Sequence, residues 1–387
     1  MVFVGIDVSK DSHSCHILSS NGKTLVENLV ISNDSNGFNT LNDSLSLMGE
    51  EIRVALESTG HYSLNIESFL RNKGYSVTLL NPLMVDKFKK SQTLRKTKTD
   101  KSDAKLIATL LFSKTQEATF DVPMEIRELK SLTRNRSRLV KEKSNLKVQI
   151  SRLLVIIFPE FKTIFSSQHR KSAYALLKIY PNIQEISNAN IDKITELLRR
   201  TSRGKYSNSK AYEIIELAKK SVGTVSRALS FELQQTIRLV EIYEQEIKII
   251  ETEIKTMLDA TKSPIATISG VGSTLGSIII SEIGNINRFS SPAKLLAFSG
   301  LEPTIYQSGQ YSATRSRMVK RGSSYLRWAL MQASRTICLT DKTFKDYLAK
   351  KRTEGKHYLV ALSHVARKLV RVIFYLLKSN KEFIPQH

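Results

Sequence analysis

Four acidic residues in the first part of the sequence stand where carboxylates could serve phosphodiester chemistry. Asp7 follows the apolar run "VFVGI", and Glu57 follows the apolar run "IRVAL". Both runs predict buried strands, so each carboxylate is expected to project from the edge of a packed sheet. A carboxylate in that place is costly unless it is hydrated, paired or bound to a metal ion. The pattern therefore favours a functional role for both residues.

Asp100 and Asp103 form a second acidic pair at the start of a helical pattern. Residues three apart share one helix face. Thr99 could cap this helix, and its first turn favours negative charge, so helix stability alone could explain the pair. Together with Asp7 and Glu57, however, the pair supplies the hard oxygen ligands that Mg²⁺ prefers. One or two such ions could stabilise the attacking and leaving oxygens of a phosphodiester.

Two other arrangements of metal-ligating residues are weaker. Glu57 and His61 are four apart, but no second histidine is placed to help them. The segment "HSCH" holds His13, Cys15 and His16 close together, yet an extended strand points one of these side chains away from the other two. The predicted metal site therefore consists of the four acids.

The charge of the chain indicates a polyanionic partner. The 387 residues include 59 Lys and Arg against 36 Asp and Glu, which gives a net charge of +23. Such an excess favours nucleic acid as the partner. The cations around the acidic pair suit a phosphate backbone. They are Lys87, Lys89, Lys90, Arg95, Lys96, Lys98, Lys101 and Lys105.

Cysteine usage and the N-terminal segment bear on the compartment. Cys15 and Cys338 are far apart in sequence, which fits a reducing cytosol and gives no disulfide framework or zinc signature. "MVFVGIDVSK" lacks the pattern of a signal peptide, and no apolar run approaches the length of a membrane span. We expect a cytoplasmic protein without a membrane partner.

Residues 1–123 predict an α/β domain. "VFVGIDVS", "HSCHILSS" and "TLVENLVIS" predict a three-stranded antiparallel meander. A helix over 36–48, a strand over 52–59, a helix over 61–74 and a strand ended by Pro82 follow. A basic helix or loop then precedes the helix that begins near Asp100. This order predicts a layered fold of the RNase H type.

Residues 124–260 predict long helices with coiled-coil seams. The first seam is Leu132, Leu139, Leu146 and Leu153, with Leu129, Arg136, Lys143 and Ile150 between them. The second is Leu233, Val240, Ile247 and Ile254, with Thr236, Tyr243, Ile250 and Met257 between them. The seams could pair as an antiparallel hairpin or across a dimer, or they could belong to ordinary bundle helices. A basic helical insertion near 160–228 shows no recognisable chemistry.

Residues 261–387 predict a third, mostly helical domain. Gly270 and Gly272 form a tight turn before a helix of small residues. Such a turn lets backbone N–H groups at a helix N-terminus approach a phosphate.

Several motifs resemble one known family. "GIDVSKDSHSCHIL", "VALESTGHY", "LLNPLMVDKF" and "LRKTKTDKSDAKLIA" resemble the N-terminal RuvC-like domain of the DEDD transposases of insertion sequences. The group is the "IS one-ten" group, which includes bridge-RNA-guided recombinases. "ISGVGSTLGSIIISEIG", "FSGLEPTIYQSGQ" and "MVKRGSSYLRWAL" resemble its C-terminal transposase domain. The motifs follow in the same order over nearly the whole chain.

The resemblance implies a mechanism and its residues. The DEDD acids fall on Asp7, Glu57, Asp100 and Asp103, which would bind Mg²⁺, and the family's nucleophilic serine falls on Ser308 of "YQSG". It implies DNA cleavage and strand exchange through a 5'-phosphoserine intermediate. It further implies a structured bridge RNA that pairs with donor and target DNA, in a prokaryotic cell where the active protein is associated with the nucleoid. The seams, and the need to cut several strands, predict a homodimer that becomes a tetramer on DNA.

The chemistry around Ser308 is incomplete by itself. A serine hydroxyl needs activation, and "YQSG" holds no histidine or carboxylate to act as base. A metal site from another domain or subunit could supply it. Gly309 would let the backbone approach DNA closely. The cations that follow are predicted to hold phosphates, unless they are plain solvated charge: Arg315, Arg317, Lys320 and Arg321.

Other hydroxyls compete with Ser308. Tyrosine recombinases use a tyrosine within an Arg/His set and need no carboxylate quartet, which weighs against Tyr306, Tyr311 and Tyr325. Further serine candidates are Ser312, Ser316, Ser323 and Ser324, of which Ser323 or Ser324 is expected to cap the helix that opens at "RGSS".

Three functions remain to be separated. The leading prediction is a transposase that recombines DNA through Ser308 and the DEDD site. The alternative is a metal-dependent endonuclease of the Holliday-junction type, with water as the nucleophile. The third is a non-catalytic protein that binds DNA or RNA.

Overall fold

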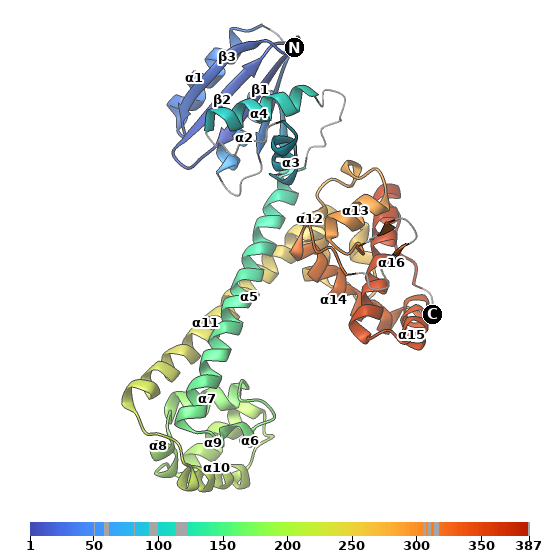
Figure 1. The fold of residues 1–387 in the computed structure, drawn as a ribbon. Helices are drawn as coiled ribbons and strands as arrows, with labels where there is room; N and C mark the ends of the chain where they lie inside the picture. The colour runs from blue at the N-terminus through green and yellow to red at the C-terminus, as the bar shows by residue number, and fades with distance from the viewer. Residues whose placement is uncertain are drawn as a thin grey trace. The chain divides into compact units, whose positions relative to one another are not determined.

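The computed structural model of the chain describes residues 1–49, 51–57, 62–80, 82–92, 100–113, 122–304, 307–308, 311–312 and 317–385. It is a mixed α/β protein in which helices predominate. It divides into two compact units, here called the first unit (Met1–Asp121) and the second unit (Val122–His387). Figure 1 labels their helices and strands.

The first unit is built on a five-stranded sheet. Its strands are β1 (Val2–Val8), β2 (Ser12–Leu18), β3 (Thr24–Ser32), β4 (Ile52–Glu57) and β5 (Ser76–Leu80), in the order β3-β2-β1-β4-β5. β1 pairs with β2 and β2 with β3 in antiparallel fashion, whereas β1 pairs with β4 and β4 with β5 in parallel. The predicted meander and the parallel strands after it are confirmed.

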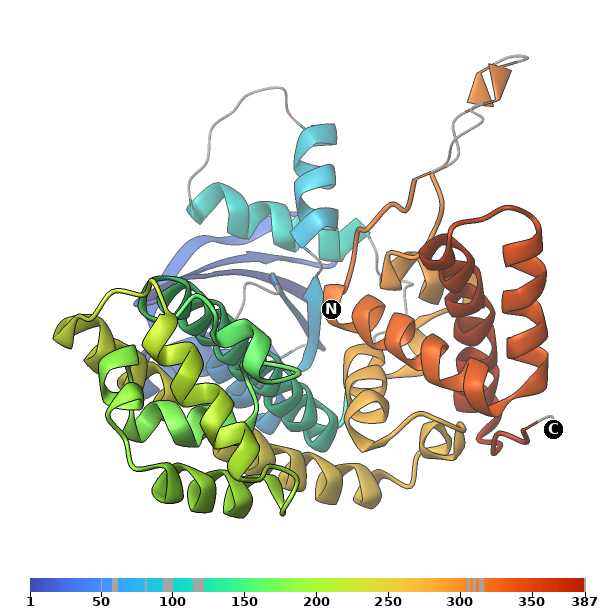
Figure 2. The same cartoon turned by 90° about the horizontal axis from the view of Figure 1, so that it is seen from below.

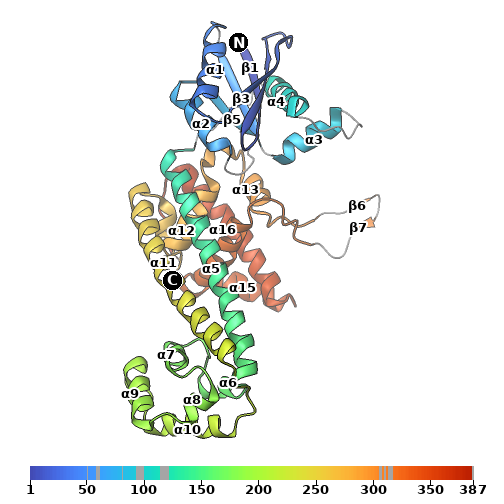
Figure 3. The same cartoon turned by 90° about the vertical axis from the view of Figure 1, so that its left-hand side faces the viewer.

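Helices cover both faces of this sheet, as Figure 3 shows. Because side chains alternate along a strand, β1 sends Val4 and Ile6 to one face and Phe3 to the other. The first face packs on α1 (Ser35–Ser46) and α2 (Ser63–Asn72). The second packs on α3 (Pro82–Gln92) and α4 (Asp100–Ser113). The basic segment after Pro82 is therefore helical as far as Gln92.

Gly5 of β1 sets the closeness of α4. A Cβ atom on Gly5 would lie 2.2 Å from the backbone nitrogen of Ala108 and 2.4 Å from the carbonyl oxygen of Ala104. Further along, the rings of Phe3 and Phe112 meet edge to face, with centroids 5.4 Å apart. Residue numbers rise along β1 from Phe3 to Gly5, whereas the numbers of the contacting residues on α4 fall from Phe112 to Ala108 and Ala104. The helix therefore runs antiparallel to β1, and its first turn lies toward the end of the strand that carries Asp7.

Replacing Gly5 with alanine is expected to destabilise the first unit by about 3 kcal/mol or more, because the added methyl group meets helix backbone that cannot move aside. Hydrogen exchange in the intact chain measures this as lost protection of the β1 amides. Unchanged protection would contradict the packing of α4 on β1.

The second unit contains a long helical hairpin. Its arms are α5 (Met124–Ile157) and α11 (Arg227–Thr261). Ion pairs join Arg136 to Glu251 at 2.5 Å and Lys143 to Glu244 at 3.7 Å. The residue numbers of these partners rise along α5 and fall along α11. The arms are antiparallel, and the seams therefore meet within the chain. The predicted seam of α11 is buried at Leu233, Thr236, Val240, Ile247 and Ile254 and half-buried at Tyr243, Ile250 and Met257. The basic interruptions of the α5 seam are explained by these ion pairs.

A small helical bundle lies between the two arms in the chain, and Figure 2 shows its green helices. They are α6 (Phe161–Ile164), α7 (Lys171–Ile179), α8 (Ile183–Ser187), α9 (Ile191–Ser202) and α10 (Asn208–Lys220). Leu176, Leu198 and Ile214 share a core with Ile157 of α5 and Ile237 of α11. The predicted helical character of 160–228 is confirmed.

The C-terminal part of the second unit is mostly helical, as predicted. It consists of α12 (Ser273–Ile283), α13 (Pro292–Ser299), α14 (Ser324–Thr340), α15 (Lys342–Thr353) and α16 (Tyr358–Ser379), with short 3₁₀ turns η1 (Pro264–Thr267) and η2 (Ile286–Arg288). Ile279, Leu330 and Leu369 belong to its core. Among the helices that the structure describes, none is long and apolar enough to cross a membrane.

Candidate active site

Asp7 and Glu57 stand side by side on neighbouring parallel strands. Ile6 of β1 pairs with Leu56 of β4, and each acid is the next residue on its strand. Ile6 and Leu56 point into the core under α1 and α2, so alternation places both acids on the opposite face, which α4 covers. Parallel strands lie about 4.8 Å apart. Both residues are half-buried.

The first turn of α4 carries the other two acids. Asp103 is buried, with 8% of its surface exposed, and its Oδ1 lies 2.5 Å from the Nζ of Lys89 on α3. Asp100 is exposed as the first residue of the helix. Since α4 runs antiparallel to β1, all four acids belong to one face of the sheet and to one end of it.

The four acids do not form a closed metal cage. Within the described ranges, no three His, Cys, Asp or Glu side chains are grouped closely enough to hold a metal ion. Lys89 already gives Asp103 the positive charge that an ion would give it. The donors fit Mg²⁺ by chemistry, since they are carboxylate oxygens at a partly solvated edge of the sheet. Lys89 would have to release Asp103 for that residue to serve as a ligand.

Of the cations near this site that were predicted to bind nucleic acid, two have carboxylate partners and three lie outside the described residues. Lys90 Nζ lies 2.7 Å from Asp86 Oδ2, so it has a carboxylate partner, as Lys89 has. Arg95, Lys96 and Lys98 lie outside the described residues, as do Thr99 and His61. Among residues with metal-ligating side chains, His13, Cys15 and His16 are buried within the sheet.

Ser308 lies in a short hairpin of the second unit. It belongs to β6 (Gln307–Ser308), which pairs with β7 (Tyr311–Ser312), and Ser308 is opposite Tyr311. The backbones on either side are also joined: Thr304 N–H donates to the carbonyl of Arg317 at 2.7 Å, and Val319 N–H donates to that of Glu302 at 2.9 Å. Tyr306, Gly309, Arg315 and Ser316 lie outside the described residues, as do the side chains of β6 and β7.

The segment after the hairpin leads into α14. Arg317, Lys320 and Arg321 are exposed on it. Ser323 ends the segment as the N-cap of α14, because its Oγ accepts a hydrogen bond from Leu326 N–H at 3.1 Å. The prediction that one of the "RGSS" serines caps this helix is confirmed. The ring of Tyr325 lies 5.1 Å from the guanidinium of Arg134, so this candidate nucleophile already has a cation against it.

The turn at Gly270 and Gly272 has the predicted form. Gly270 has a φ of +78°, which favours glycine, and Gly272 is the N-cap of α12 without a side-chain cap. A Cβ on Gly272 would meet nothing within 4 Å, so the helix N-terminus is open on that side.

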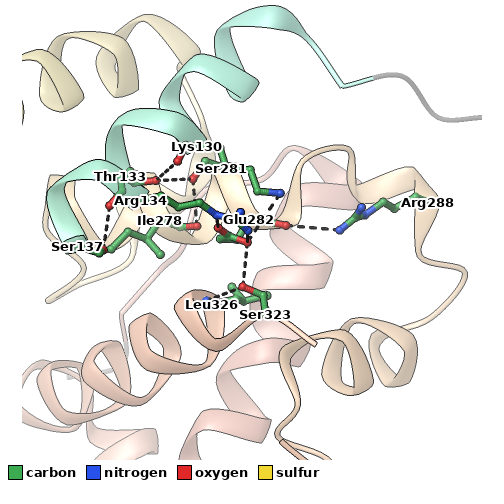
Figure 4. A network of polar contacts seen from close by, with 10 residues as sticks. All are labelled: Lys130, Thr133, Arg134, Ser137, Ile278, Ser281, Glu282, Arg288, Ser323 and Leu326. Carbon is green, nitrogen blue, oxygen red and sulfur yellow. Dashed lines mark hydrogen bonds and ion pairs between the residues drawn. The ribbon is translucent and has the colours of Figure 1, made fainter. Parts of the chain in front are cut away.

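Figure 4 shows a polar network around Glu282 that the sequence analysis did not predict. Glu282 of α12 is 1% exposed and accepts hydrogen bonds from Arg134 Nε at 2.7 Å and Arg134 Nη2 at 3.1 Å. Ser323 Oγ donates to it at 2.8 Å, and Lys130 Nζ lies 3.8 Å away. The network joins α5, α12 and the start of α14. The one signal in the sequence is an acid inside the apolar run "SIIISEIG".

Charges dominate this network. Burial would raise the pKa of Glu282, but the hydrogen bond from Arg134 and the charge of Lys130 lower it overall, so the carboxylate stays ionised. Burial lowers the pKa of Lys130, and the neighbouring Arg134 and Arg288 lower it further, against the attraction of Glu282. Arg288 is held by stacking on Phe289 and Phe298 at 4.6 and 4.4 Å. Three cations thus surround a single carboxylate.

Comparison with known proteins points to one family. A model of the DEDD transposases matches residues 4–159, and a model described as "Transposase IS116/IS110/IS902 family" matches residues 262–349. A protein of insertion element IS116 from Streptomyces clavuligerus is 24% identical over 99% of this chain and 96% of its own. A pilin gene-inverting protein from Moraxella bovis is 21% identical over 98% and 97%. The transposase for insertion sequence element IS1328 from Yersinia enterocolitica is 33% identical over 36% and 43%.

The two family models separate the candidate catalytic residues into the same two groups, the acids and Ser308. One model spans the strands with Asp7 and Glu57 and the helix with Asp103, and the other spans the hairpin with Ser308 and the network at Glu282. The chain therefore belongs to the IS110/IS116 family of insertion-element transposases.

Proposed function

We propose that this transposase cuts and rejoins DNA through a covalent 5'-phosphoserine at Ser308, with Mg²⁺ held by Asp7, Glu57, Asp100 and Asp103. The observation that carries the proposal is the register of β1 and β4, which puts Asp7 and Glu57 side by side on the face that α4 covers. A pair of carboxylates there, beside an acidic helix turn, suits phosphodiester chemistry.

We further propose that the first unit is an RNase H or RuvC-like domain. Its support is the strand order β3-β2-β1-β4-β5, with an antiparallel meander followed by parallel strands. The proposed domain division is a catalytic domain over 1–123, a coiled-coil region over 124–260 and a transposase domain over 261–387.

The proposed reaction needs no energy source. Ser308 Oγ attacks a backbone phosphorus and loses its proton, a P–O bond forms to the serine, and the bond to the 3' oxygen breaks to leave a 3' hydroxyl. The 3' hydroxyl of another strand reverses these changes and releases the serine. Bound Mg²⁺ would supply positive charge at the phosphate and at the leaving oxygen. Arg317, Lys320 and Arg321, exposed beside the hairpin, would hold the flanking phosphates.

A structured bridge RNA is proposed as the guide that pairs with donor and target DNA. The net charge of +23 supports a large polyanionic partner. Strand exchange should then require RNA from the non-coding DNA beside the reading frame. Recombination that proceeds unchanged after ribonuclease treatment would contradict this part of the proposal. The DNA substrate would place the active protein at the nucleoid of a prokaryotic cell.

The alternative function is an endonuclease that uses the same acids and water. The relative from Moraxella bovis is named for inverting a gene, and an inverted segment must be rejoined, which favours the recombinase. The test supplies the purified chain with donor DNA, target DNA, RNA and Mg²⁺. Joined strands support the recombinase, whereas free ends without any joined product support the nuclease.

We also propose a homodimer that becomes a tetramer on DNA. Large apolar side chains are exposed along α11, at Phe231, Leu239, Ile242 and Ile249, with the last two seven residues apart. Such a stripe suits a second coiled-coil partner. Light scattering is expected to give at least twice the mass of one chain, and a monomer even with nucleic acid bound would rule this out.

A further inference from the structure

The helix α5 carries cations on two faces. On one, here called the neutralised face, the cations are paired with carboxylates of α11, whereas the other face holds more cations than carboxylate partners. Arg136, Lys143 and Lys147 point toward α11. Their nitrogens lie 2.5, 3.7 and 3.6 Å from carboxylate oxygens of Glu251 and Glu244. These cations serve the hairpin.

The other face carries a row of cations that we call the α5 basic row: Lys130, Arg134, Arg138 and Lys141. Their spacings of four, four and three residues keep them on one side of the helix. Lys130 and Arg134 share Glu282. Arg138 donates to Asn135 Oδ1 at 2.7 Å, and both Arg138 and Lys141 are exposed. Among the ion pairs of the described residues, neither has a carboxylate partner, although Glu142 lies one turn beyond Arg138 on the same helix.

The basic row begins beside the N-cap of α14. Arg134 bonds Glu282, which also accepts from Ser323 at the start of α14, as Figure 4 shows. Arg288 contributes a further cation through its bond to the carbonyl of Glu282 at 3.4 Å. The cations of α5 and Arg288 therefore gather around Glu282, next to the N-cap of α14.

The spacing of the row fits a nucleic-acid backbone. One cation per helical turn recurs about every 5.4 Å. Phosphates of one strand recur about every 3.4 Å along a duplex axis. Arg138 and Lys141, which are exposed and have long side chains, can therefore each reach a separate phosphate.

We propose that the α5 basic row is a binding track for the phosphate backbone of nucleic acid. This inference rests on the proposed function, in which the chain handles DNA and RNA, and it assigns part of that contact to α5. Its ligand is a run of phosphodiesters, which either a DNA duplex or a folded RNA could supply.

The chain offers a charge-matched control. Arg138→Gln with Lys141→Gln removes two charges from the basic row, and Lys143→Gln with Lys147→Gln removes two from the neutralised face. The control breaks only partly exposed ion pairs, which contribute little to stability. Circular dichroism of the intact chains verifies that both variants are folded.

Binding is measured by fluorescence anisotropy against salt, with a duplex DNA and a hairpin RNA as separate probes. The basic-row variant is expected to lose roughly 25- to 60-fold in affinity at about 0.1 M salt, and its salt slope should fall by about 1.4 to 1.8. The control should stay close to the unaltered chain. A loss confined to one probe identifies that nucleic acid as the ligand, and a loss with both identifies a track that does not discriminate.

Two results would overturn the inference. Equal affinities and salt slopes for the two variants would show that the basic row is solvated charge, while the proposed function would stand. If the unaltered chain bound neither probe, the proposed function would be wrong, and the inference that rests on it would be wrong as well.

Discussion

Replacing Ser308 with alanine is expected to reduce strand exchange by at least about 1,000-fold while DNA binding stays unchanged, because the hydroxyl is the covalent carrier of the phosphate. Ser308 lies on β6 of a two-residue ladder, and the change removes only the side-chain hydroxyl, so the backbone groups that form the ladder are kept. The measurement is the yield of joined strands from paired donor and target duplexes.

Ser312 provides the matched control for this prediction. It lies on β7 opposite Gln307 and was the nearest serine competitor in the sequence. Ser312→Ala should recombine at the rate of the unaltered chain. If Ser308→Ala retained activity and Ser312→Ala lost it, the assignment of the nucleophile would be wrong.

Replacing Asp7 with asparagine, or Glu57 with glutamine, is expected to reduce DNA cleavage by at least about 1,000-fold, because each change removes an anionic oxygen ligand while keeping the shape of the side chain. Each amide has nearly the size of the carboxylate that it replaces, and the preceding residues Ile6 and Leu56 remain in the core. Cleavage of a labelled duplex is measured over a range of Mg²⁺ concentrations.

Asp11→Asn is the control for the acids. Asp11 is exposed in the turn between β1 and β2, four residues from Asp7, and the same substitution there should leave cleavage unchanged. If Asp7→Asn and Glu57→Gln cleaved DNA at normal rates with the normal Mg²⁺ requirement, the metal site would have to lie elsewhere.

Much of the first unit could be predicted from local patterns. Apolar runs predict the strands, and the two runs are followed directly by Asp7 and Glu57, so the two acids share an end of the sheet once the strands are parallel neighbours. The closeness of α4 could not be predicted, because it depends on Gly5 meeting Ala104 and Ala108, about a hundred residues later in the chain.

The second unit shows why a heptad repeat alone does not identify the partner of a helix. The repeat at Leu233, Val240, Ile247 and Ile254 predicted a buried seam but not its partner, since a seam on one helix fits any matching seam. Arg136 and Lys143 looked like interruptions until Glu251 and Glu244 were found opposite them. The bond between Arg134 and Glu282 joins residues 148 apart, which no local pattern reports. Ser308 was assigned by family resemblance, because the pattern around it left several hydroxyls open.

In the proposed reaction, Ser308 becomes covalently joined to DNA. To detect this bond, the chain is incubated with Mg²⁺, RNA and a nicked duplex. Cleavage of this duplex releases the strand end that carries the 3' hydroxyl, so that rejoining fails. Nuclease and trypsin digestion then yield peptides for mass spectrometry, among them the tryptic peptide over residues 295–315. We expect this peptide to carry a nucleotide phosphate on Ser308. A nucleotide on Tyr311 or Ser312, or cleaved DNA with no peptide adduct, would contradict it.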